Sequence, residues 1–174
     1  MNRNFAREAF RLVFNNLSRV LDKPGDLEIR SKIQIGAYLA GISLINSGSG
    51  PAGALSYPLG VHFKVPHGLA GAVFIPHIIR HNISCGYDYS ELYNLIDSAD
   101  RSIPEDRKNK DFSTKLSELC RVLDIPDTLR PFGVDAKSVE ILCKEAGLLE
   151  KAFAQNPVLF SVRDAQDLLR KMAG

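Results

Sequence analysis

Apolar residues recur at intervals of three and four along most of the chain, which is the period of an amphipathic helix. No stretch that alternates apolar and polar residues runs for more than four positions, so the pattern of a half-buried strand is missing. With 174 residues, the chain has the length of one globular domain, or at most of two very small ones. The sequence therefore predicts an all-α fold of six to eight helices, in a single helical domain over residues 1–174.

Capping residues and helix breakers place the ends of these helices. The first is expected from Phe5 to Leu21, before the Lys-Pro-Gly run at 23–25 stops it. Asp26 stands at the N-cap of a second helix, which ends near Gly48. Because the second helix is apolar on most faces, we expect it at the centre of the bundle. Further helices are expected over 70–83, 89–96, 112–122, 135–149 and 152–153 and after Ser161, which would form a capping box with Asp164.

The segment 47–71 is rich in glycine and proline, yet it also carries Leu, Val, Phe and Ala throughout. A flexible linker would be polar, so we expect a buried, tightly routed segment here. Pro76 lies too far inside the helix expected next to be a start signal, and it predicts a kink or a pair of broken helices.

Charge and cysteine content narrow the function classes. The chain has 22 Lys and Arg against 20 Asp and Glu, with no basic stripe, which disfavours a nucleic-acid partner. No apolar window is long enough to span a membrane, and the N-terminus lacks the apolar core of an export signal. The 3 cysteines are far apart and odd in number, so they indicate neither a disulfide framework nor a zinc cluster. We expect a cytoplasmic protein.

The four histidines, His62, His67, His77 and His81, all fall within twenty residues. Imidazole is the commonest first-row metal ligand and the usual acid or base near neutral pH, so the cluster invites a metal or proton-transfer interpretation. The alternative is a surface or capping role, which we favour for His62, His77 and His81. His67 differs because it lies in the Pro-His-Gly sequence at 66–68, directly before an expected helix.

An ordered set of motifs carries a family resemblance over almost the whole chain. They are the stretches AYLAGISLIN at 37–46, LSYPLG at 55–60, PHG at 66–68, AVFIPHIIRHN at 72–82, LDIP at 123–126, GV at 133–134 and NP at 156–157. In this order they resemble the C-terminal helical domain of the iron-containing, group III alcohol dehydrogenases. The resemblance implies a fold like that domain, which is also dehydroquinate synthase-like, and an oxidoreductase that interconverts alcohols and aldehydes with NAD(P).

The same resemblance implies a site with Fe²⁺ or Zn²⁺ between two domains. The family reads H-x-x-x-H-P-x-G before its P-H-G, and its first and last histidines are metal ligands. Here the corresponding positions are Gly53, Tyr57 and His67, so His67 is the one ligand that survives and Gly53 replaces another. Tyr57 is expected to face the substrate as a hydrogen-bond donor, or else to pack as an ordinary aromatic. Pro58 and Gly60 are expected to line the cofactor cleft.

Two further ligands of the family, an Asp and a His, and its glycine-rich nucleotide-binding domain have no counterpart in this sequence. We therefore expect a fragment or a half-enzyme that binds neither metal nor NAD(P) tightly alone, and that associates with a nucleotide-binding partner chain or with itself. A non-catalytic helical interaction or dimerisation module derived from the family is the alternative, and an unrelated helical domain is a third. The exposed apolar surface for association is expected around Leu55, Tyr57, Leu59 and Phe63.

Overall fold

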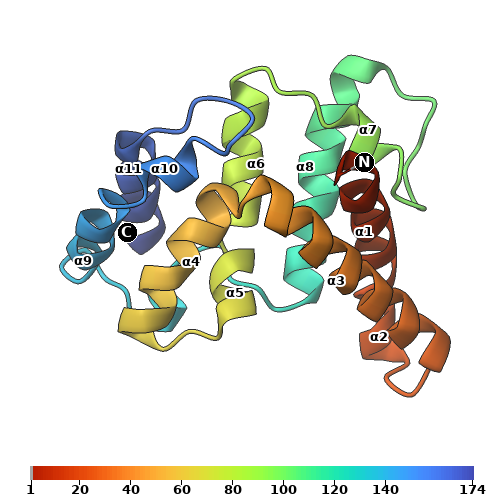
Figure 1. Ribbon diagram of the computed structural model, residues 1–174, viewed down its shortest axis with the longest axis horizontal. Coiled ribbons are helices and arrows are strands. Elements are labelled where there is room, and N and C mark those ends of the chain that lie inside the picture. Colours follow the sequence, from red (N-terminus) through yellow and green to blue (C-terminus); the bar gives the residue numbers. More distant parts are fainter. Residues whose placement is uncertain (1) are drawn as a thin grey trace. The chain divides into compact units, whose positions relative to one another are not determined.

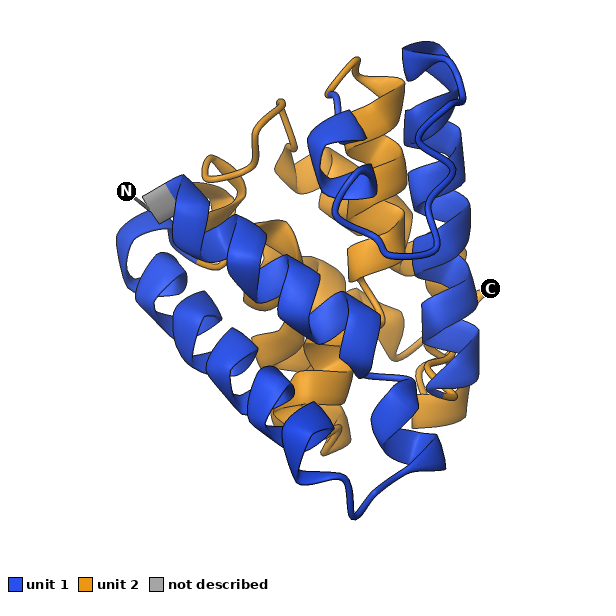
Figure 2. Ribbon diagram, turned by 90° about the vertical axis from the view of Figure 1, so that its right-hand side faces the viewer, with its two compact units in different colours: residues 1–48, 88–123 blue, residues 49–87, 124–174 orange. Residues whose placement is uncertain are grey.

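The computed structural model describes residues 2–174 and is built of helices joined by turns (Figure 1). No strand occurs among these residues, which confirms the predicted all-α fold. Eleven α-helices and one 3₁₀ turn are present in the same range, more than the six to eight predicted. The helices expected over 5–21 and 70–83 are each divided in two, and the segment 47–71 contains a helix that was not expected. The helices fall into two compact units, one of residues 1–48 and 88–123 and the other of 49–87 and 124–174 (Figure 2).

The first unit is organised around a pair of long helices. Its elements are α1 (Asn2–Asn16), α2 (Arg19–Asp22), α3 (Leu27–Ser47), α7 (Ser90–Tyr93) and α8 (Glu105–Val122). α3 packs closely along α1 at Gly36, where an added Cβ would lie 2.7 Å from Val13 Cγ2. On α8, the buried Phe112 ring stacks on Tyr89 with ring centroids 5.3 Å apart.

The prediction of a single first helix is wrong in one respect, because the chain forms two helices here, α1 and α2, which are separated after Asn16. The side-chain amides of Asn15 and Asn16 donate to the carbonyls of Arg11 and Leu12, four residues earlier. Such side-chain bonds compete with the backbone ladder of the helix. The Asn15 side chain also bonds to the 95–97 loop, because its Nδ2 donates to Leu95 O and its Oδ1 accepts from Asp97 N.

The second predicted helix, α3, begins as expected but is not central. Asp26 caps it by accepting from the backbone N–H of Glu28 and Ile29. Only Ile29, Gly36 and Ser43 are buried along its length. The expectation of a central helix is therefore wrong: α3 buries a narrow strip against α1 and leaves much of its apolar surface exposed.

The second unit holds the larger core. Its elements are α4 (Gly50–Phe63), α5 (His67–Ala72), α6 (Ile75–Ser84), the 3₁₀ turn η1 (Arg130–Phe132), α9 (Val139–Ala146), α10 (Glu150–Phe153) and α11 (Val162–Ala173). Leu55 and Leu59 of α4 are completely buried in this core together with Phe74 and Leu142. The expectation that Leu55 and Leu59 would be exposed is wrong, because they lie on the face of α4 that packs inside its own unit.

The glycine- and proline-rich segment is largely helical, which its composition did not predict. α4 starts with Pro51 in its first turn, where the missing N–H costs no hydrogen bond, and it contains Pro58 in its interior. The expected pair of broken helices is confirmed, since α5 ends at Ala72 and α6 begins at Ile75. Pro76 stands in the first turn of α6, so the expectation that it lies too far inside to be a start signal is wrong. At the other end of the chain, Ser161 and Asp164 form the predicted capping box of α11.

None of the helices in the described part of the chain combines the length and the apolar character that a bilayer-crossing segment needs.

Candidate functional site

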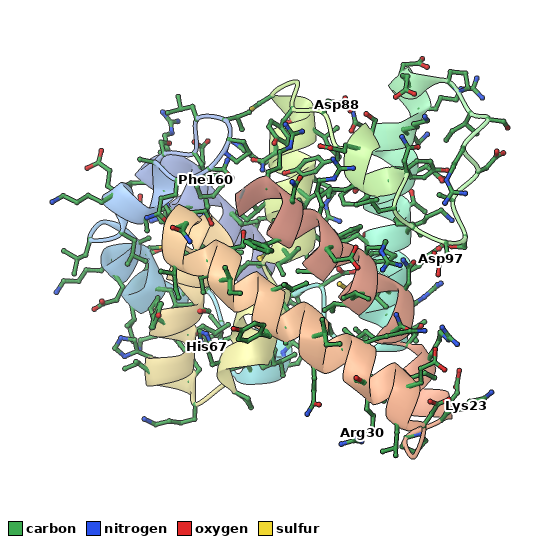
Figure 3. The ribbon with its side chains drawn as sticks, turned by 45° about the vertical axis from the view of Figure 1, so that its right-hand side comes forward. Lys23, Arg30, His67, Asp88, Asp97 and Phe160 are labelled. Carbon is green, nitrogen blue, oxygen red and sulfur yellow. The ribbon has the colours of Figure 1, made fainter. Side chains whose placement is uncertain are left out.

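The start of α5 lies beside α4 and brings Tyr57 and His67 together. α4 ends at Lys64, which has left-handed backbone angles, and Pro66 is extended before α5 begins at His67. This turn reverses the chain so that the two helices contact each other. The ring centroids of Tyr57 and His67 are 5.6 Å apart, and both side chains are exposed. Figure 3 labels His67, which begins α5.

Ser56 contacts one ring nitrogen of His67 and so orients its imidazole. Its side chain is buried, its hydroxyl donates to Gly53 O at 2.6 Å, and its Oγ lies 3.4 Å from His67 Nδ1. Because the hydroxyl hydrogen is used at Gly53, Ser56 Oγ is an acceptor for Nδ1–H at this contact. In the neutral ring this arrangement puts the hydrogen on Nδ1 and leaves a lone pair on Nε2. Ser56 was not predicted from the sequence, since a serine next to Tyr57 carries no signal of its own.

Gly53 lies one helical turn before Tyr57 on α4. It offers no side chain, and the space where a side chain would begin is filled. An ideal Cβ at this position would lie 2.5 Å from Ser49 Cβ and 3.0 Å from Ser49 Oγ. Ser49 therefore occupies the space in which a residue-53 side chain would begin.

The two residues expected to line a cofactor cleft are structural neighbours of the same turn. Pro58 is buried inside the second unit. Gly60 is half-buried, and an added Cβ there would lie 3.4 Å from Val65 O. The small residue at 60 thus allows the 64–66 turn to come close to α4.

The remaining histidines bind to backbone or acidic groups elsewhere in the second unit. His77 Nε2 donates to Asp127 O at 3.0 Å, while Arg80 Nη2 donates to His77 Nδ1 at 3.1 Å. Burial of the ring lowers the pKa of His77, and the positive charge of Arg80 lowers it further. His81 Nε2 lies 2.8 Å from Leu159 O. These contacts give both histidines a role in holding loops to α6.

His62 stands apart from that pair, with its Nε2 3.9 Å from Glu145 Oε1 of α9. The imidazole of His62 thus faces a carboxylate, although at a distance too long for a hydrogen bond. None of His62, His77 and His81 is brought to the Tyr57–His67 pair by a contact in the described residues.

The donors around His67 do not fit a divalent metal held by this chain. Within residues 2–174, no group of three or more His, Cys, Asp and Glu side chains gathers as a metal site. A catalytic Zn²⁺ or Fe²⁺ centre normally takes three or more protein ligands. At this site the chain supplies one imidazole, two hydroxyl groups and a glycine, so the described residues fall short of that number.

A hollow of about 380 Å³ lies in the first unit, between α1, α8 and the 96–98 loop. Its floor is apolar, with Phe14, Ile96, Leu119 and Val122. Two of its polar residues are already occupied, since Asn15 bonds to the 95–97 loop and Lys115 Nζ donates to Ser98 O. We interpret it as a groove left where the loop crosses the helices, and not as part of the Tyr57–His67 site.

Comparison with known proteins gives consistent matches. A family model described as "Fe-containing alcohol dehydrogenase family, C-terminal" matches residues 1–173. The chain is 28% identical over 151 residues to Long-chain-alcohol dehydrogenase 1 of Geobacillus thermodenitrificans, an alignment that covers 86% of this chain and 38% of that protein. It is 26% identical over 145 residues to lactaldehyde reductase of Escherichia coli strain K12, covering 83% and 38% of the two chains.

Solved structures agree on the fold. A crystal structure of 1,3-propanediol oxidoreductase superposes with a TM-score of 0.87 at 22% identity, and covers 98% of this chain and 45% of that one. An iron-containing alcohol dehydrogenase from Thermococcus thioreducens superposes with a TM-score of 0.79 at 25% identity, over 99% and 44% of the two chains. This chain thus spans less than half the length of the relatives it matches.

Proposed function

The chain belongs to the Fe-containing alcohol dehydrogenase family, as its C-terminal domain, and from this premise we propose that it is the helical half of an oxidoreductase that interconverts alcohols and aldehydes. The observation that carries the proposal is the family match over residues 1–173 together with the paired Tyr57 and His67 side chains. We include in the proposal a nucleotide-binding body that supplies NAD(P), located on a partner polypeptide or elsewhere in a longer chain.

The residues of this half would bind and orient the substrate oxygen. In the proposal the exposed hydroxyl of Tyr57 donates a hydrogen bond to an alcohol or carbonyl oxygen. His67, oriented by Ser56, presents an unprotonated Nε2 that accepts the hydrogen of an alcohol. Neither group transfers hydride, so no turnover is expected from these residues alone.

Binding of small alcohols to the isolated chain tests the substrate-facing role. We expect titration with short primary alcohols to cause saturable NMR shifts of the Tyr57 and His67 side chains, while His62 stays unchanged as the internal control. Tyr57→Phe should weaken the binding several-fold, because the donor is lost while the ring remains. If neither Tyr57 nor His67 responds to any alcohol of the series, the pair does not face substrate and the proposal fails.

A turnover assay tests the half-enzyme part. We expect the purified chain to show no oxidation of NADH or NADPH with small aldehydes, with or without added Zn²⁺ or Fe²⁺. Turnover that disappears in His67→Ala would show that this chain carries a complete site, which contradicts the need for a second body.

A second candidate function is an interaction module, and the exposed face of α3 favours it. Tyr38 and Ile45 are 71% and 87% exposed, and Ile35 lies on the same stripe of the helix. No Asp, Glu, Lys or Arg occurs between Lys32 and Lys64. An apolar helix face of this kind is typical of a protein–protein contact. We propose a second copy of the chain as its occupant, because an uncharged face is self-complementary.

Sedimentation measurements test the interaction module. We expect a concentration-dependent dimer that Ile45→Glu converts to a monomer, since a charge would be buried in the contact. Leu159→Glu is the matched control, because Leu159 is 83% exposed and lies in the other unit. A chain that remains monomeric at high concentration would contradict this assignment. A dimer that Ile45→Glu and Leu159→Glu dissociate equally would contradict it too.

A further inference from the structure

We infer that Ser49 closes position 53 to any side chain, so that the site at residues 53, 57 and 67 works without a resident divalent metal. The inference rests on the proposed function in so far as it concerns the same site. It goes further, because it concerns the packing of Ser49 against Gly53. This packing would prevent a histidine at position 53 from acting as a metal ligand unless Ser49 were changed as well.

The turn before α4 carries Ser49 over Gly53. Gly48 and Gly50 both have left-handed backbone angles, with φ of 76° and 59°, and Ser49 between them has φ −89° and ψ −11°. Left-handed angles are easily adopted by glycine and are strained for other residues. This double reversal brings the Ser49 side chain back against the first turn of α4.

A hydrogen bond from another segment also fixes the turn at residues 48–50. Gly50 N donates to Gln155 Oε1 at 3.1 Å, which ties the turn to the segment after α10. Pro51 follows in the first turn of α4, and its ring restricts φ. Ser49 therefore cannot move away from position 53 without breaking the bond to Gln155 or straining the start of α4.

The atom closest to an added side chain at position 53 is Ser49 Cβ, which side-chain rotation cannot move. A Cβ at residue 53 would meet Ser49 Cβ at 2.5 Å, which is about 1 Å inside the normal separation of two carbon atoms. A Cβ is fixed to the backbone, so rotation of the serine hydroxyl does not relieve the contact. Any residue other than glycine at 53 must displace the turn itself.

The donor chemistry agrees with this steric argument. Imidazole nitrogen suits first-row divalent ions. Among residues 2–174, His67 is the one histidine that contacts Tyr57, and no group of three or more possible metal ligands gathers there. Tyr57 and Ser56 contribute hydroxyl groups, and the Ser56 hydroxyl already donates to Gly53 O. The group that remains is suited to hydrogen bonding with a neutral oxygen compound and not to coordination.

The first experiment measures the packing by thermal unfolding. We expect Gly53→Ala to lower the Tm of the chain, although alanine is the better helix former. In a Ser49→Gly background the same substitution should leave the Tm unchanged or raise it. Ser49→Ala is the matched control, because it keeps the Cβ and should not relieve the effect. Gly68→Ala, where nothing lies within 4 Å, shows the effect of alanine without a clash.

The second experiment measures metal binding directly. Gly53→His with Tyr57→His places two imidazoles one turn apart on α4, beside His67. We expect this double variant to bind Zn²⁺ and Co²⁺ no more tightly than Tyr57→His alone, whereas adding Ser49→Gly should raise the affinity about tenfold or more. Helical content by circular dichroism confirms that each variant is folded.

Three results would each overturn the inference. The first is a stoichiometric Zn²⁺ or Fe²⁺ ion that stays with the unmodified full chain after dialysis. The second is an equal metal affinity of the Gly53→His, Tyr57→His variant with and without Ser49→Gly. The third is an effect of Gly53→Ala on the Tm that is the same with and without Ser49→Gly. Both readouts are independent of the alcohol titration, so a failure of this inference is distinguished from a failure of the proposed function.

Discussion

Single side chains in this molecule show how contacts, and not residue type, determine what a histidine does. His67 has a serine hydroxyl at Nδ1 and leaves Nε2 exposed, whereas both ring nitrogens of His77 are engaged, by Asp127 O and by Arg80. The first arrangement leaves an acceptor for a ligand. The second joins α6 to the connector after α8 and requires a neutral ring.

The neutral state of His77 predicts a pH dependence of stability. Its pKa is lowered from the ordinary value of 6.5, first by burial and then by the charge of Arg80, with a smaller lowering from Lys171 and an opposing effect of Asp127. Between the lowered value and 6.5, the unfolded chain binds a proton that the folded chain does not. The stability is therefore complete above pH 6.5 and falls as the pH decreases towards the lowered value.

Urea unfolding at a series of pH values measures this effect. We expect the free energy of unfolding of the unmodified chain to fall below pH 6.5, and this fall to be smaller in His77→Gln. His62→Gln is the control, and it should keep the full dependence because that substitution leaves His77 in place. Parallel curves for the chain and for His77→Gln would contradict the assignment.

At the level of helices, the close approach of α3 to α1 depends on a glycine where the two helices contact each other. α1 and α3 come together at Gly36, where an added Cβ would lie 2.7 Å from Val13 Cγ2 and 3.3 Å from Ala9 O. Gly41 lies on the same helix with nothing within 4 Å. The two glycines share a helix and a residue type, and they differ only in what lies opposite.

This difference predicts opposite effects of the same substitution. Gly36→Ala should destabilise the chain by about 1–3 kcal/mol, because the extra carbon forces α1 and α3 apart. Gly41→Ala should stabilise it by up to about 1 kcal/mol, because alanine is favoured over glycine in a helix and meets no neighbour. Chemical denaturation of both variants decides this, and effects of equal sign would show that the α1–α3 contact is looser than described.

The last helix depends on its capping box. Ser161 Oγ accepts from Asp164 N, and Asp164 Oδ2 accepts from Ser161 N at 2.8 Å. Removing the hydroxyl with Ser161→Ala should cost about 1 kcal/mol. Ser161→Asn, which can still cap, should restore most of the loss, and urea unfolding compares the two. If both variants were equally unstable, the cap would not be the source of the effect.

On the scale of the whole molecule, the chain builds two compact units from interleaved stretches of sequence. The second unit has a continuous apolar core that joins α4, α5, α6, α9 and α11. Leu142 of α9 is completely buried in it, while the neighbouring Ile141 is 45% exposed. Both side chains are aliphatic and they are adjacent on the same helix. Comparing substitutions at the two positions therefore distinguishes the effect of burial from the effect of side-chain type.

We expect Leu142→Ala to lower the free energy of unfolding by about 2–5 kcal/mol, since it leaves a cavity in the core. Ile141→Ala should cost much less because its side chain is already partly in solvent. Hydrogen exchange should show the loss of protection in α9 and α11 before α1 and α3. Equal loss in all four helices would mean that the two units unfold as one.

Much of the fold follows from local sequence. The spacing of apolar residues, Asp26 before α3 and the Ser161–Asp164 box act over a few residues, so they determine helices and helix ends wherever these elements pack. The motifs at 55–60 and 66–68, with the other stretches in the same order, likewise predicted the family, which the family match over residues 1–173 confirms.

Tertiary structure alone decided which surfaces are covered. Leu55 and Leu59 are apolar like Tyr38 and Ile45, yet the first two are buried and the others exposed, because helices distant in sequence pack on one face and not on the other. The contact between Ser56 Oγ and His67 Nδ1 is decided in the same way. It depends on the placement of α5 beside α4, which local backbone preferences do not specify.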